Sequence, residues 1–333
     1  MKFLLAVLLL LFSFVFSLSC GTSDLGFVNV LRILTGFETR QDWSFILYEF
    51  RFPKALAALG TGAALSVSGL MMQTFFRNPL AGPYVLGISG GANLLVGFVI
   101  LAGSGLGLNL APLMVDFGLP VFACLGAVAA MVIILFLSSL IRSTSSLLLI
   151  GIMLGFIYGA LQNILEFFAG STDMKRFVLW NMGSVGNVFG ADLIILLSVT
   201  CAGIFASLFL AKSLDIFLFG DEYAMSVGLN LPLIHFFIII TTGILSGITV
   251  AYCGPIAFVG LAVPHLCRMF WKTAHHLVLI PATAIIGSAL LLFCDAFGNL
   301  FSDRFVLPVN VTTSLFGAPF LIYLLFRNKK LNA

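Results

Sequence analysis

The sequence predicts an all-α polytopic membrane protein with about ten transmembrane helices. Of its 333 residues, 61% are hydrophobic and only 9% are charged, whereas soluble proteins carry about 25% charged residues. Apolar runs close to the roughly 20 residues that span a hydrocarbon core recur along the whole chain. Helices pair all their backbone groups internally, and the alternating pattern of a membrane barrel is absent. Because no polar domain interrupts these runs, residues 1–333 are expected to form one transmembrane domain.

The breaks between the apolar runs define ten expected helices. They lie at about 3–19, 53–74, 88–103, 119–140, 146–168, 191–211, 232–252, 256–270, 278–298 and 308–326. The first run follows Lys2 and precedes Cys20, a pattern that also describes a secretory or lipoprotein signal. We retain it as a helix because an even count fits the charged C-terminus. The run at 256–270 is short and contains glycine and proline, so a half-helix or a broken helix is expected there.

The charged residues of the chain report its topology. The basic tail Arg327–Lys330 predicts a cytoplasmic C-terminus and, with an even number of helices, a cytoplasmic N-terminus. The net charge of +3 is small and gives no sign of a nucleic-acid partner. Two outer segments, 20–52 and 169–190, are long enough to be docking surfaces. The six scattered cysteines form no CxxC pair and are interpreted as small buried hydrophobic residues.

Small residues follow a helical stripe in the fifth expected helix. Gly151, Gly155 and Gly159 are four residues apart, and Gln162 and Glu166 fall on the same stripe. Such spacing lets helices pack closely in lipid, while polar side chains inside a membrane often mark a watery path. The two interpretations agree if the stripe is a subunit interface around a central path.

The segment RNPLAGPYVLGISGGA, Arg77–Ala92, interrupts two apolar runs with a charge, two prolines and four glycines. Irregular backbone at membrane depth is tolerated where protein buries it or water reaches it. The segment is therefore expected to turn the chain at one face of the bundle, or to lie at the mouth of a cavity.

A second polar segment, GDEYAMSVGLN at Gly220–Asn230, separates two expected helices. It contains an E-x-A-x-x-x-G arrangement formed by Glu222, Ala224 and Gly228. A short amphipathic helix that ends at a glycine can seat in a groove of another protein. Without further information, an ordinary solvated loop is an equally good interpretation.

Five blocks in a fixed order resemble the iron-complex and cobalamin permease family of ATP-binding-cassette importers. They are the stretch from RFPK at Arg51 to GGA ending at Ala92, WNMGSVG at 180–186, the GDEYAMSVGLN segment, GPIAFVGLAVPHLCR at 254–268 and LPVNVTTSLFGAPFLIYLL at 307–325. The resemblance covers nearly the whole chain and implies the type II ABC importer permease fold.

The resemblance also implies a set of partners. The permease is expected to be a homodimer in membrane lipid, joined by two ABC ATPase subunits and a periplasmic or lipid-anchored substrate-binding protein. No lysine follows a glycine, so the chain lacks a phosphate-binding loop, and ATP with its Mg²⁺ is expected on the ATPase subunits. The chain itself is expected to bind no cofactor and to be no enzyme. Its coupling segment at about 213–231 would meet the ATPase through Asp221, Glu222, Ala224 and Gly228.

Further site residues follow from matching positions in the family. The expected translocation path comprises Gly151, Gly155, Gly159, Gln162, Glu166, Asn310, Thr313 and Ser314. The expected contacts to the binding protein are Arg51, Lys54 and Arg304. The family usually carries arginine at the position of Asn299, and Arg304 is a candidate replacement. Asp295 lies inside an expected helix, either as a buried packing residue or as part of the path.

These features predict a permease that moves an iron complex, either a siderophore or haem, or cobalamin across the bacterial cytoplasmic (inner) membrane. An ion-coupled secondary transporter using Glu166 and Asp295 is the alternative. An intramembrane enzyme is disfavoured because no serine shares its expected membrane depth with a histidine. His265 and Cys267 are two residues apart, an awkward helical spacing for a shared metal, so no metal site is expected.

Overall fold

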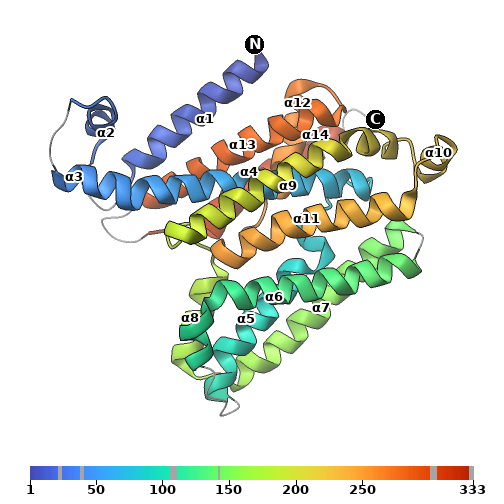
Figure 1. The fold of residues 1–333 in the computed structure, drawn as a ribbon, viewed down its shortest axis with the longest axis horizontal. Helices are drawn as coiled ribbons and strands as arrows, with labels where there is room; N and C mark the ends of the chain where they lie inside the picture. Colours follow the sequence, from blue (N-terminus) through green and yellow to red (C-terminus); the bar gives the residue numbers. More distant parts are fainter. Residues whose placement is uncertain (22–24, 38–40, 106–110, 142, 301–305, 330–333) are drawn as a thin grey trace.

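The computed structural model describes residues 1–21, 25–37, 41–105, 111–141, 143–300 and 306–329, which form helices and connections without any strand (Figure 1). The long helices are α1 (Lys2–Ser19), α4 (Phe52–Phe75), α5 (Ile88–Gly105), α6 (Ala111–Leu140), α7 (Thr144–Phe168), α9 (Gly190–Phe217), α11 (Leu231–Cys253), α12 (Val259–Trp271), α13 (His276–Asn299) and α14 (Val309–Lys329). Shorter elements are α2 (Phe27–Leu34), α3 (Gln41–Phe45), the π-helix η1 (Ile46–Arg51), the 3-10 helix η2 (Pro83–Leu86), α8 (Ser171–Asn181) and α10 (Asp221–Ser226).

All ten expected helices are present, and seven helices among the described residues are long and apolar enough to cross a membrane. These seven lie within Lys2–Ser19, Gln41–Phe75, Gly118–Leu140, Thr144–Phe168, Gly190–Phe217, Leu231–Cys253 and His276–Asn299. The apolar parts of α5 and α14 are shorter, and α12 has 13 residues. The all-α membrane class is confirmed, while a count of ten full crossings stays a prediction.

Helix α4 lies at the centre of the molecule, packed against α9, α11, α12 and α13. Its close contacts depend on glycine, because lipid supplies no hydrophobic drive for helix association and backbones must approach directly. A Cβ atom at Gly62 would meet the backbone of Gly287, and one at Gly69 would meet the carbonyl group of Gly260. Buried polar side chains join the same helices, since the hydroxyl of Ser66 donates to the carbonyl oxygen of Thr283 at 2.8 Å.

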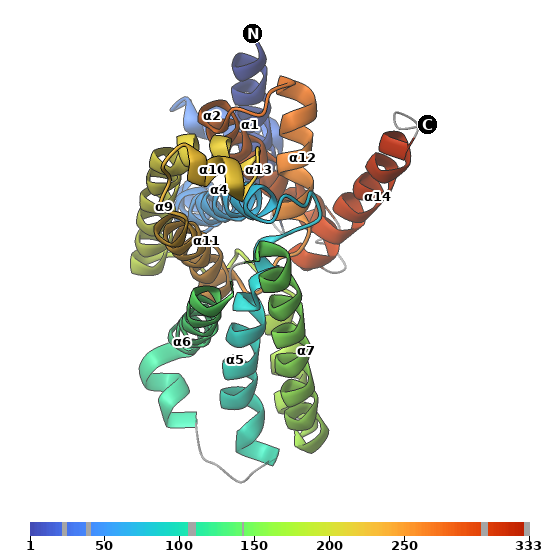
Figure 2. The same ribbon diagram turned by 90° about the vertical axis from the view of Figure 1, so that its right-hand side faces the viewer.

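Helices α5, α6 and α7 form a second group that extends from the rest of the bundle (Figure 2). Within it α5 approaches α6 at Gly91 and Gly126, where an added Cβ would meet the opposing backbone. Helix α6 has a break at Gly118, which has a φ of 72°. Pro120 follows two residues later. The helix expected to begin at residue 119 thus corresponds to the part of α6 beyond this break.

The interruption at Arg77–Ala92 turns the chain from α4 into α5. Arg77 has a φ of 48° at the turn, and the side-chain oxygen of Asn78 accepts a bond from the backbone nitrogen of Leu80 at 2.9 Å. Gly87 then ends η2 with a φ of 73°, a conformation that favours glycine. The segment is therefore a turn that lies against α7, so the expectation of a turn is confirmed.

The N-terminal helix and the cysteines complete the comparison with the expectations. Helix α1 packs along α13, where the rings of Phe16 and Phe293 stack at 6.1 Å. All six cysteines have free thiols. Cys253, Cys267 and Cys294 are buried as expected, but Cys124 and Cys201 are exposed on the surface of this single chain. Those two residues are not buried within the chain itself, because an apolar helix in a membrane can face lipid instead of other protein.

Candidate functional site

An open hollow of about 680 Å³ lies between α7, α8 and α14. Its walls contain three of the expected path residues, Glu166, Asn310 and Ser314, which come from the middle and the C-terminal part of the sequence. The remaining lining residues are Met174, Phe177, Val178, Asn181, Met182, Val311 and Leu315. Helices α7 and α14 lie on the same side of the molecule in Figure 2. Most of the lining is apolar, with a few polar groups near helix ends.

Asn310 fixes the start of α14 within this wall. Its side-chain oxygen accepts a bond from the backbone nitrogen of Ala257 at 3.1 Å, and its own backbone nitrogen donates to the carbonyl oxygen of Met182 at 3.2 Å. The hydroxyl of Ser314 donates to the carbonyl oxygen of Asn310 at 2.6 Å. These bonds hold α14, the end of α8 and the segment before α12 together, so the polar groups of the hollow are preorganised.

Helix α8 is the wall that the sequence analysis missed, because the whole segment 169–190 was expected to be an outer docking surface. Met174, Phe177 and Val178 have the spacing of one helical face, and this face lines the hollow. The same spacing in the sequence could have revealed the helix. Its last residue, Asn181, accepts a side-chain bond from Asn93 of α5 at 3.1 Å.

Glu166 places a carboxylate at the hollow near the C-terminal end of α7. One of its oxygens accepts a bond from the side-chain nitrogen of Gln162 at 2.8 Å. A carboxylate held by one neutral donor keeps further lone pairs for water or for a passing solute. Gln162 thus orients the carboxylate of Glu166 at the hollow.

The glycine stripe of α7 divides into two parts. A Cβ at Gly151 would meet the carbonyl oxygen of Val85, so this glycine packs against η2. A Cβ at Gly155 or Gly159 would meet nothing within 4 Å, so this part of the stripe is open in the single chain. Thr313 is buried and donates to the carbonyl oxygen of Asn310 at 3.2 Å. Gly151 and Thr313 are therefore packed within this single chain, and their place in the path stays a prediction.

The three expected docking cations have different environments. Arg51 is buried, and its guanidinium donates to the carbonyl oxygen of Leu18 at 2.6 Å and lies against Gly21. It holds the end of α1 and also lines the same hollow as Lys54, while its contact with a binding protein stays a prediction. Arg304 lies outside the described residues.

Lys54 forms an ion pair with Asp295, with 3.0 Å between the ammonium nitrogen and a carboxylate oxygen. The side chain of Asp295 is 4% exposed, that of Lys54 is 25% exposed, and the amide of Asn299 lies 3.3 Å from the second carboxylate oxygen. Lys54 therefore neutralises the buried carboxylate, and Asn299 adds a neutral donor where the family usually has arginine. Lys54 and Asn299 line a second hollow of about 360 Å³, so Asp295 belongs to a different place from Glu166.

Helix α10 forms a small protrusion between α9 and α11 (Figure 1). Gly220 and Gly228 flank it with φ values of 105° and 88°, which favour glycine. Ala224 is buried against the chain, Glu222 is exposed, and Asp221 pairs with Arg77 at 3.3 Å. The side chains with large exposed apolar surfaces here are Phe219, Tyr223, Met225 and Val227. The segment is thus a short helix with exposed apolar side chains and not an ordinary loop, while its coupling role stays a prediction.

The comparison with known proteins agrees with this arrangement over nearly the whole chain. The sequence profile of the FecCD transport family matches residues 9–327. The chain belongs to the FecCD transport family. Among curated relatives, the hemin transport system permease protein HmuU of Yersinia pestis is 34% identical over 315 residues, which cover 94% of this chain and 93% of the relative.

Two further similarities extend this result. The vitamin B12 import system permease protein BtuC of Klebsiella pneumoniae is 36% identical over 286 residues, covering 85% of this FecCD-family chain and 83% of BtuC. A solved structure described as an inward-facing metal-chelate type ABC transporter superposes with a TM-score of 0.83 at 27% identity and covers 97% of both chains. The chain therefore has the type II ABC importer permease fold. Among its described residues, no group of three or more histidine, cysteine or acidic side chains could hold a metal ion.

Proposed function

We propose that this FecCD-family permease imports an iron complex, either a siderophore or haem, or cobalamin, across the bacterial cytoplasmic membrane. The observation that carries the proposal is the hollow in which Glu166, Asn310 and Ser314 meet, bordered on α7 by the open glycines. The relatives named for hemin and vitamin B12 support this class of cargo. The lining offers few polar groups, which suits a path that must release a bulky solute after binding it weakly.

The open part of the α7 stripe favours a homodimer around this path. Gly155 and Gly159 expose backbone between large apolar side chains such as Phe156 and Ile157. A second copy can approach such a surface closely, since small residues allow backbone contact between helices. In the proposed dimer, the hollows of the two copies face one axis and together form the path.

Energy for transport is proposed to come from two ABC ATPase subunits, which bind ATP and Mg²⁺. Helix α10 offers them the exposed side chains of Glu222, Tyr223 and Met225, and a groove of another protein can hold such a short helix. Closure of the ATPase pair would displace α10 and switch the path between its outward-facing and inward-facing states. A periplasmic or lipid-anchored binding protein would deliver the cargo at the opposite end, where Lys54 lines the second hollow.

The ion-coupled alternative draws no support from the positions of the two carboxylates. Glu166 lines the hollow between α7 and α14, whereas Asp295 is paired with Lys54, which lines the other hollow. Ion coupling would be better served by carboxylates that share one site with open coordination positions.

Reconstitution tests the proposal directly. The chain is placed in liposomes with its ATPase and binding protein, and uptake of haem, a ferric siderophore and cobalamin is measured with and without ATP. Glu222→Arg is the test variant, because its charge reversal on α10 leaves the path unchanged. ATP-dependent uptake of one cargo that this variant abolishes is the expected result. Uptake driven by an ion gradient without any effect of ATP would overturn the proposal.

A further inference from the structure

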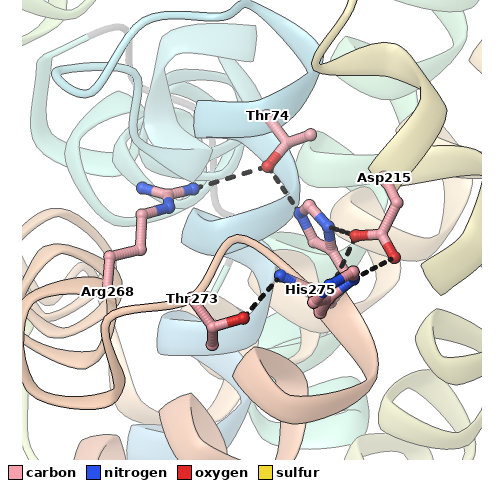
Figure 3. Close-up of polar contacts among 6 residues, drawn as sticks. Thr74, Asp215, Arg268, Thr273 and His275 are labelled. Atoms are coloured by element: carbon pink, nitrogen blue, oxygen red, sulfur yellow. Dashed lines mark hydrogen bonds and ion pairs between the residues drawn. The ribbon is translucent and has the colours of Figure 1, made fainter.

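A partly buried polar cluster joins four helices at the end of the bundle that carries α10. Its members come from the last turns of α4 and α9, from α12 and from the first turn of α13, and Figure 3 labels Thr74, Asp215 and Arg268 among them. They are Gln73, Thr74, Asp215, Arg268 and His276. Neither the path nor the exposed face of α10 accounts for this cluster.

His276 is at the centre of the cluster and is 1% exposed. Its backbone nitrogen and its Nδ1 atom lie 2.8 Å and 2.6 Å from the same carboxylate oxygen of Asp215. The other ring nitrogen, Nε2, lies 2.7 Å from the hydroxyl oxygen of Thr74. Because the carboxylate can only accept, Nδ1 carries a proton; in the neutral ring, Nε2 then accepts from the Thr74 hydroxyl.

Arg268 completes a chain of bonds that all run in one direction. Its guanidinium lies 3.4 Å from the hydroxyl oxygen of Thr74 and donates to the side-chain oxygen of Gln73 at 2.5 Å. The order of donation is therefore Arg268 to Thr74, Thr74 to His276, and His276 to Asp215. Hydrogen bonds aligned between a cation and a carboxylate polarise one another, so each bond in the series strengthens the others.

The series of hydrogen bonds from Arg268 to Asp215 ends beside α10. Asp215 is in the last turn of α9, which leads through Gly220 into α10. Thr74 is in the last turn of α4, and Arg77 just beyond it pairs with Asp221 of α10. The end of α4 is thus connected to the α9–α10 corner twice, once through the hydrogen bonds of Thr74, His276 and Asp215 and once through the Arg77–Asp221 ion pair nearer the surface.

We propose that the Arg268–Thr74–His276–Asp215 chain is the joint that transmits displacement of α10 to α4, α12 and α13. The proposal rests on the proposed function, in which an ATPase moves α10. Apolar side chains can slide past one another, whereas directional buried bonds must keep their partners or leave polar groups unsatisfied. A push on α10 reaches the end of α9 through a short connection, and the joint carries it to the central helix α4. Thr74 and His276 are positioning residues for transport, remote from the cargo.

The test compares two substitutions of the same residue. Thr74→Val removes the bridging hydroxyl at constant shape, and Thr74→Ser keeps it. The reconstituted importer is assayed for ATP hydrolysed and cargo taken up, and the ratio of the two is the readout. We expect Thr74→Val to lower cargo moved per ATP by about tenfold, a size typical of a coupling free energy between sites, with hydrolysis near that of the parent and Thr74→Ser close to the parent in both.

A second comparison separates a joint from ordinary packing. If Thr74 and Asp215 act through the same series of hydrogen bonds, combining Thr74→Val with Asp215→Ala lowers the cargo moved per ATP no further than the more damaging single variant does. If the two residues act independently, the fold losses of the two single variants multiply. Asp215→Asn is measured as well, because it keeps an oxygen acceptor for His276 but removes the negative charge. If Thr74→Val does not yield a folded complex, Asp215→Asn takes its place as the test of the joint. A ratio like that of the parent in the valine variant, equal losses for valine and serine, or multiplied losses in the double variant would overturn the inference. Absence of ATP-driven uptake in the parent would instead overturn the proposed function.

Discussion

Helices α4 and α7 are both long, apolar and glycine-bearing, yet they occupy opposite positions in the molecule. In their most apolar stretches, 89% of the residues are buried for the span that contains α4 and 22% for α7. The glycines show why. Gly62 and Gly69 of α4 meet backbone of α13 and α12, whereas Gly155 and Gly159 of α7 meet nothing in the chain. The same residue type thus serves packing within one chain in α4 and remains open for a second surface in α7.

The strongest way to break this comparison is Gly69→Leu. A side chain there would collide with the carbonyl group of Gly260, which is backbone and cannot rotate away. We expect the free energy of unfolding to fall by about 3 kcal/mol or more, at the upper end for overpacking. Unfolding of the purified protein in detergent measures this, with Gly26→Ala as the control because its Cβ would meet nothing within 4 Å. An unchanged unfolding midpoint for Gly69→Leu would contradict the packing of α4.

Lys54→Met tests whether α4 also depends on charge partners within the chain. The substitution keeps the length of the side chain but leaves the buried carboxylate of Asp295 without its cation. We expect a loss of about 2 kcal/mol, below the 3–5 kcal/mol for a fully buried pair because Lys54 is partly exposed. The same unfolding assay applies. Combining Lys54→Met with Asp295→Asn is expected to recover much of the loss, and equal instability of single and double variants would refute the pairing.

Gly155→Leu with Gly159→Leu sharpens the comparison from the other side. A Cβ at either position would meet no atom of its own chain within 4 Å, so the monomer is expected to keep its stability. We expect the dimer to weaken by about tenfold, equivalent to about 1.4 kcal/mol, because close approach of a second copy is blocked. Dimerisation measured by fluorescence transfer in liposomes tests this, with alanine at both positions as the matched control. A destabilised monomer, or a dimer of parent affinity, would refute the assignment of this face.

Glu166→Gln is expected to have the smallest effect. The substitution keeps the shape of the side chain and its bond with Gln162 and removes only the charge at the hollow. Uptake driven by ATP is expected to change by about twofold or less, which corresponds to well under 1 kcal/mol of activation free energy. The uptake assay described above measures this, with Gln162→Glu as a charge-adding comparison. Complete loss of uptake in Glu166→Gln together with dependence on an ion gradient would instead favour ion coupling.

Much of the fold could be predicted because the relevant signals are local. Long apolar runs gave the helices, and glycine or proline gave their ends, as at Gly118 of α6 and at the turn that begins with Arg77. The segment around Glu222 formed a short helix, which is one of the two interpretations that its pattern alone left open. The site was predicted less completely. Glu166, Asn310 and Ser314 do share one hollow, but α8 supplies a wall that was assigned to docking.

The sequence by itself determined that this protein is a helical membrane permease, because composition, run length and ordered motifs are properties of the chain read in one dimension. Only the tertiary structure decided which charges and glycines meet. Arg51 became a buried support for α1, Lys54 became the partner of Asp295, and His276 joined Thr74 to Asp215. These contacts join residues far apart in the chain at distances of a few ångströms, and helical periodicity specifies the face of a residue but not the helix that packs against it.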